Sequence, residues 1–122
     1  MDRVAVGAWI AERPRQRRER RRGWLGRDRI EPRDAMLLER CRSVHTFGMR
    51  VPITVAFLDR SWCVIRVVRA RPGRMLFCRR ARRVLECHIG ADVRIGDVLN
   101  RQGAPVGPAI QDGPDIARSA RT

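Results

Sequence analysis

The chain of 122 residues contains no lysine and no tyrosine, and asparagine occurs only once, as Asn100. These three amino acids have A/T-rich codons, whereas the abundant arginine, alanine, glycine, valine and proline have G/C-rich codons. The absence of lysine therefore indicates a GC-rich genome, and it needs no selection for the bidentate contacts that arginine makes with phosphate. Base composition does not explain why basic residues outnumber acidic ones.

Long apolar runs and paired cysteines are also missing. No stretch approaches the roughly 18 apolar residues that cross a bilayer. The first charged run follows a short apolar segment, which reverses the order of a secretion signal. We therefore expect a cytoplasmic protein with no membrane partner. Cys41, Cys63, Cys78 and Cys87 form no C-x-x-C pair, so the sequence predicts no metal site, no disulfide framework and no cofactor.

Arginine is the residue in excess: 27 basic residues against 13 acidic ones give a formal net charge of +14. Residues 13–29 hold nine of the arginines and only two acidic residues. The middle of this segment, residues 15–22, has good helix formers and no proline, which predicts one short helix ending at Gly23. The charge excess attracts polyanions, so nucleic acid or another polyanion is a candidate partner.

The rest of the chain has the pattern of short strands. Expected strands cover residues 4–10, 35–38, 51–58, 62–70, 75–77 and 83–89, with a turn at residues 96–97 entering a last one. Residues 51–58 (VPITVAFL) are almost continuously apolar, which predicts a central strand covered on both faces. Residues 59–61 form a tight polar turn, so residues 51–70 are expected to make a β-hairpin.

These elements predict a mainly β fold, a compact antiparallel β-barrel or sandwich with one short N-terminal helix. Residues 1–102 are expected to form a single β-rich domain. Residues 103–122 contain few large apolar side chains and several prolines and glycines, which predicts a flexible tail.

An ordered series of motifs resembles one bacterial and archaeal family, domain of unknown function 192. The most specific is VHTFGMRVPITVAFLD at residues 44–59; the others are RRRGWLGR at 20–27, MLLERCRS at 36–43, ARRVLE at 81–86 and GDVL at 96–99. Thr54 stands where the family usually has aspartate, which removes a carboxylate that acid–base chemistry would use. The resemblance implies a β-rich barrel or sandwich with one short helix, and it implies no particular reaction or ligand.

Three residues are candidates for a ligand site: His45, Arg50 and Glu86, near one concave end of the expected fold. His45 lies in the most specific motif and can act as a base or a ligand, although a hydrogen-bonded structural histidine is commoner. Glu86 lies in an apolar strand and needs a partner, which Arg50, Arg82 or Arg83 could supply; such pairs are more often architectural than catalytic.

The leading interpretation is a non-catalytic ligand-binding or interaction module. The first alternative is sequence-independent binding of nucleic acid through residues 13–29, with Arg17, Arg18, Arg20 and Arg21 as the contacts. This segment has one aromatic residue, Trp24, and lacks interleaved stacking residues. The second alternative is a small-molecule enzyme that uses His45 and Glu86.

Overall fold

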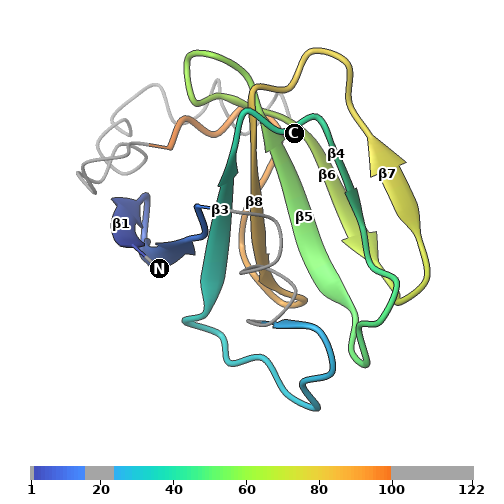
Figure 1. Cartoon of the computed structure of the whole chain (residues 1–122). Coiled ribbons are helices and arrows are strands. Elements are labelled where there is room, and N and C mark those ends of the chain that lie inside the picture. Colours follow the sequence, from blue (N-terminus) through green and yellow to red (C-terminus); the bar gives the residue numbers. More distant parts are fainter. Residues whose placement is uncertain (1, 16–23, 100–122) are drawn as a thin grey trace.

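The structure, a computed structural model, describes residues 2–15 and 24–99, and these contain eight β-strands (Figure 1). The strands are β1 (Asp2–Val6), β2 (Trp9–Arg13), β3 (Ala35–Glu39), β4 (Ser43–His45), β5 (Ile53–Leu58), β6 (Val64–Ala70), β7 (Met75–Phe77) and β8 (Arg83–His88). The mainly β fold class is thereby confirmed. The helix expected at residues 15–22 and the tail expected at 103–122 fall, apart from residue 15, outside the described residues.

The strands form one large sheet and one small sheet. The large sheet has the order β1-β2-β3-β8-β5-β6, and the small sheet pairs β4 with β7. All neighbours are antiparallel except β2 and β3. The large sheet does not close, because β1 and β6 remain its two edges. The expectation of a barrel or sandwich is therefore only partly confirmed, because the strands are layered in two sheets that do not close into a barrel.

The expected hairpin of β5 and β6 is confirmed, with Ile53 paired to Ala70 and Val55 paired to Val68. Its turn is built by Asp59, whose carboxylate accepts backbone N–H groups of Ser61 at 2.8 Å and Cys63 at 3.0 Å. These bonds satisfy turn donors that have no strand partner, which is the usual role of aspartate in tight turns.

The single strand expected at residues 4–10 is wrong, because these residues fold into the hairpin of β1 and β2. Val6 pairs with Trp9, which leaves a two-residue loop of Gly7 and Ala8. Gly7 has a φ of 56°. A glycine with positive φ at the first loop position is typical of a type II′ hairpin turn. Gly7 therefore interrupts an apolar run that otherwise reads as one strand.

Two apolar clusters lie on the two faces of the large sheet. Ile53, Val55 and Phe57 of β5 belong to the cluster beneath the small sheet, which also contains Val44, Leu76 and Trp24. Ala56 and Leu58 belong to the opposite cluster, which contains Val6, Val93 and Leu99. All six residues of β5 are buried, which confirms that this strand is covered on both faces. At the end of the described segment 24–99, the expected last strand is reduced to one bridge between Val98 and Cys63.

Candidate functional site

Three connections meet at one end of the large sheet: β3 to β4, β5 to β6, and β7 to β8. The backbone N–H of Cys41 donates to the carbonyl of Arg82 at 3.1 Å. The N–H of Cys78 donates to the carbonyl of Arg42 at 2.8 Å. The N–H of Arg82 donates to the carbonyl of Leu58, the last residue of β5, at 2.7 Å. These bonds fix the three connections, and the arginines that they carry, relative to one another.

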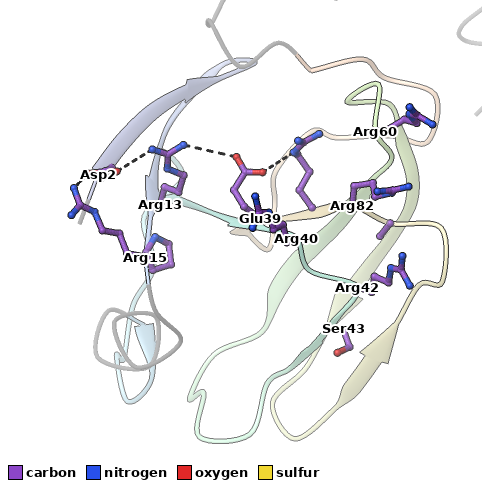
Figure 2. Close-up of a pocket in the computed structure, with 12 residues that line it drawn as sticks. Asp2, Arg13, Arg15, Glu39, Arg40, Arg42, Ser43, Arg60 and Arg82 are labelled. Atoms are coloured by element: carbon purple, nitrogen blue, oxygen red, sulfur yellow. Dashed lines mark hydrogen bonds and ion pairs between the residues drawn. The ribbon is translucent and has the colours of Figure 1, made fainter.

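The connections and the β1–β2 hairpin line an open groove of about 1240 Å³, which we call the arginine groove (Figure 2). Its lining residues are Asp2, Arg13, Pro14, Arg15, Glu39, Arg40, Arg42, Ser43, Arg60, Ala81, Arg82 and Arg83. Seven of these are arginines and only two are carboxylates. Field lines concentrate in a cleft lined by one sign of charge, so this groove attracts anions.

On one side of the arginine groove, the arginines are paired with the two carboxylates. Asp2 accepts hydrogen bonds from Arg13 at 3.0 Å and from Arg15 at 3.2 Å. Glu39 accepts from Nε of Arg83 at 3.0 Å and lies 4.0 Å from Arg13. Figure 2 shows these contacts as a continuous row. Hydrogen bonds from Arg13 and then Arg15 lower the pKa of the Asp2 carboxyl, so this carboxylate stays ionised and paired at neutral pH.

Arg83 has a second partner, which places it among the residues that hold the fold together. Its guanidinium carbon lies 4.0 Å from the centroid of the Trp62 ring. Such a cation–π contact at a partly exposed site contributes about 0.5–1 kcal/mol. Together with the Glu39 ion pair, it fixes the guanidinium of Arg83 in one orientation.

On the other side of the groove, four arginines are exposed: Arg40, Arg42, Arg60 and Arg82. Among the described residues, no carboxylate lies within ion-pair distance of any of them. They stand on turns, where no neighbouring strand supplies an opposite charge. Each guanidinium carries five N–H donors in a planar fork that matches phosphate oxygens. These four residues are the part of the groove that can bind an anion without breaking an existing pair.

The backbone of Arg40 is strained. Its φ of 50° lies in the left-handed region, which side chains larger than asparagine rarely adopt. Residues held in such conformations cluster at binding and catalytic sites because the surrounding structure must impose them. Here the reversal at Arg40 lets the chain leave β3 and enter β4, and it leaves the Arg40 side chain at the groove.

The three residues expected to form a ligand site lie on different parts of the fold. Glu86 is 1% exposed and lies in β8, paired with Met36 on one side and Val55 on the other. Arg50 is exposed and binds Asp28 at 2.9 Å. His45 ends β4 in the small sheet. None of the three lines the arginine groove. A ligand site at these positions stays a prediction.

The expected nucleic-acid contacts Arg17, Arg18, Arg20 and Arg21 lie outside the described residues. Two other members of the same basic segment, Arg13 and Arg15, line the arginine groove. The sequence therefore pointed to one flank of the groove. It missed Arg40, Arg42, Arg60 and Arg82 because these are scattered over three turns, and the only signal for them is that arginine recurs where strands end.

The described residues offer little support for metal or thiol chemistry. Within residues 2–15 and 24–99, no three histidine, cysteine, aspartate or glutamate side chains gather as metal ligands do. Burial raises the pKa of the Cys87 thiol to about 12, and the adjacent Glu86 carboxylate contributes to this rise. A thiol with this pKa is almost never a thiolate at neutral pH, so Cys87 acts as a small core residue. None of the described segments forms a helix long and apolar enough to cross a membrane.

Comparisons with known proteins agree on the fold. A profile of the DUF192 family, described as uncharacterized ACR, matches residues 2–99. No curated protein matches the chain. A structure of a protein of unknown function from Novosphingobium aromaticivorans is 17% identical, with a TM-score of 0.62 over 80% of this chain and 83% of that one.

A second similar structure comes from Sinorhizobium meliloti, and the name of that protein proposes a transcription regulator. It is 18% identical, with a TM-score of 0.60 over 84% of this chain and 92% of that one. At this level of identity, both structures show a shared fold and nothing more about function.

Proposed function

The chain belongs to the DUF192 family, and on that premise we propose that it is a non-catalytic module that binds the phosphate backbone of nucleic acid in the arginine groove. The family description supplies no reaction. The observation that carries the proposal is the set of four exposed arginines, Arg40, Arg42, Arg60 and Arg82, with no counter-ion among the described residues.

The physical basis is counter-ion release. A polyanion carries condensed cations, and a protein that neutralises its phosphates with arginine releases them, so the affinity falls steeply as salt rises. A groove with several fixed guanidinium groups neutralises several phosphates at once. The groove is open and is lined by turns, so a linear polymer can lie in it and extend beyond its ends. The name of the Sinorhizobium meliloti protein is consistent with such a ligand, and it is a statement about that protein alone.

The test replaces four charges in the groove at once. In Arg40→Gln/Arg42→Gln/Arg60→Gln/Arg82→Gln, we expect unchanged folding, because these side chains are exposed and make no ion pair with described residues. Binding to a fluorescent oligonucleotide is measured by anisotropy from about 50 to 200 mM salt. For a single strand, the slope of log affinity against log salt should flatten by about 3, at roughly 0.7 for each phosphate that an arginine no longer neutralises.

A matched control removes the same charge elsewhere. Arg17→Gln/Arg18→Gln/Arg20→Gln/Arg21→Gln also lowers the net charge by four, and it changes the basic segment rather than the four groove positions. We expect this control to flatten the slope by less than half as much. An equal or larger effect of the control would reject the groove and favour residues 13–29 as the nucleic-acid contact. An affinity independent of salt in the wild-type protein would reject the proposal altogether.

A further inference from the structure

The outer face of the small sheet carries exposed apolar side chains. In β4 and β7, Ser43 pairs with Phe77 and His45 pairs with Met75. Side chains alternate between the faces of a sheet, and the intervening pair is buried in the core, so these four residues share the outward face. Met75 is 69% exposed and Phe77 is 56% exposed. This face is therefore an apolar surface that the described residues leave uncovered.

An exposed ring stack extends the same face. The rings of His45 and Phe47 are stacked, with centroids 5.1 Å apart and planes inclined by 24°. Phe47 remains 48% exposed, so one side of the stack is open. The buried Thr46 between them is fixed: its hydroxyl donates to the carbonyl of Arg71 and accepts from the N–H of Arg74, both at 2.8 Å. The stack is thus presented by a rigid backbone.

The apolar face runs directly into the arginine groove. Ser43 lines the groove and is the strand partner of Phe77. Figure 2 shows Arg42 and Ser43 next to each other beside this sheet. Arg66 donates to the carbonyl of Phe77 and adds another cation at the border. Residues two apart on a strand are about 6.6 Å apart, so Phe77 and Met75 offer successive positions along a line that leads away from the groove.

We propose that the ligand is single-stranded nucleic acid, with phosphates in the arginine groove and bases stacked on Phe77 and on the exposed side of Phe47. This inference rests on the proposed function and deepens it by naming the form of nucleic acid. Proteins that bind single strands combine a cationic groove with aromatic side chains, because every base has a π-face that stacks regardless of sequence. In a duplex the bases are already stacked on one another and their faces are not available.

Charge complementarity favours a nucleic acid over a second copy of this chain as the occupant. The outward positions of the small sheet include no acidic residue, and Arg42, Arg66 and Arg74 border them. Two copies brought together on this face would place like charges opposite each other, which is unfavourable. An anionic ligand meets the same arginines with attraction.

The experiment distinguishes the contribution of the bases to affinity from the contribution of the phosphates. An oligothymidylate of about 16 nucleotides is compared with an abasic phosphodiester of the same length and with a duplex. The wild-type protein should bind the oligothymidylate at least about 5-fold more tightly than either of the other two, since stacking of one base contributes about that factor or more. In Phe47→Leu/Phe77→Leu, the preference over the abasic chain should disappear. Phe77→Trp should keep it.

Ile10→Ala is the matched control, because Ile10 is 60% exposed and lies outside the groove and the small sheet. It should bind all three ligands as the wild-type protein does. Equal wild-type affinity for oligothymidylate and the abasic chain, both lost in the four-arginine variant, would overturn the stacking proposal and leave the proposed function standing. If Phe77→Leu converted a dimer to a monomer and left the oligothymidylate affinity unchanged, the stacking proposal would be overturned in favour of self-association. If the four-arginine variant bound oligothymidylate as tightly as the wild-type protein, both the stacking proposal and the proposed function would be rejected.

Discussion

The two sides of the arginine groove use the same side chain for different purposes. On one side, Arg13, Arg15 and Arg83 form ion pairs with Asp2 and Glu39, at distances of 3.0–4.0 Å. On the other side, the arginines on the turns have no carboxylate partner among the described residues. The difference teaches that the total charge of a surface does not tell how many of its cations lack a carboxylate partner; the proposed function depends on that second number.

Burial follows this division only in part, because Arg15 on the paired side is 73% exposed. The side chains of Arg13, Arg83 and Glu39 are 20–29% exposed, so their ion pairs are partly shielded from water. A charge in such a position needs its partner, because removal of one member leaves the other partly desolvated. The arginines on the turns are well hydrated without a ligand, so their replacement costs little stability. Stability should thus depend on the paired side, and affinity on the unpaired side.

The largest effect is expected from Glu39→Gln, which removes the carboxylate between Arg13 and Arg83. The free energy of unfolding should fall by about 1–2 kcal/mol, because two partly buried guanidinium groups lose a charged acceptor. Affinity for a single-stranded oligonucleotide should rise at the same time, since up to two further cations become available. Urea denaturation measures the first quantity and anisotropy the second. If this variant were less stable and also bound the oligonucleotide more weakly, stability and affinity would not be divided between the paired and unpaired sides of the groove.

A smaller effect is expected from Asp2, because its carboxyl remains accessible to water. Its folded-state pKa lies below the ordinary value of 3.8, owing to Arg13 first and Arg15 second. The carboxylate therefore stabilises the fold above its unfolded-state pKa, and this contribution is lost as the pH falls through its folded-state pKa. Carboxyl chemical shifts followed by NMR titration measure this pKa. In Asp2→Asn the corresponding stability change with pH should vanish, and oligonucleotide affinity at neutral pH should rise.

The smallest effect is expected from Arg50→Gln. Its ion pair with Asp28 joins side chains that are 64% and 82% exposed, and exposed pairs of this kind contribute only about 0–1 kcal/mol. Arg50 does not line the groove, so the slope of affinity against salt should remain within error of the wild-type value. A loss as large as that of a groove arginine would mean that net charge alone governs binding.

The hairpin of β5 and β6 was predictable because its residues carry the information locally. Residues 51–58 are apolar on both faces, and Asp59 supplies the turn acceptor within four residues of its donors. The β1–β2 hairpin was not predicted, since a single glycine, Gly7, is the only sign of a turn in this apolar run, and its positive φ is known only from the structure. A hairpin can thus be predicted from the sequence when both strands and the turn between them carry clear local patterns.

The arginine groove was not predictable for the opposite reason. Arg40, Arg60 and Arg82 lie about twenty residues apart in the sequence, and only the pairing of β3 and β5 with β8 brings their turns together. The same holds for the apolar face, where Phe77 meets Ser43 across a strand pair. Phe77 therefore lies beside a groove residue only because of this strand pairing, which the sequence alone does not show.

The way in which the β1–β2 hairpin is attached has a consequence for the paired side of the groove. β2 and β3 are joined in parallel by one residue pair, Glu12 with Met36. Val6 and Ala11 of the hairpin are fully buried in the apolar cluster on one face of the large sheet. Apolar packing therefore helps to set where the hairpin holds Asp2 and Arg13, so a cavity made in that cluster would disturb charges that it does not touch.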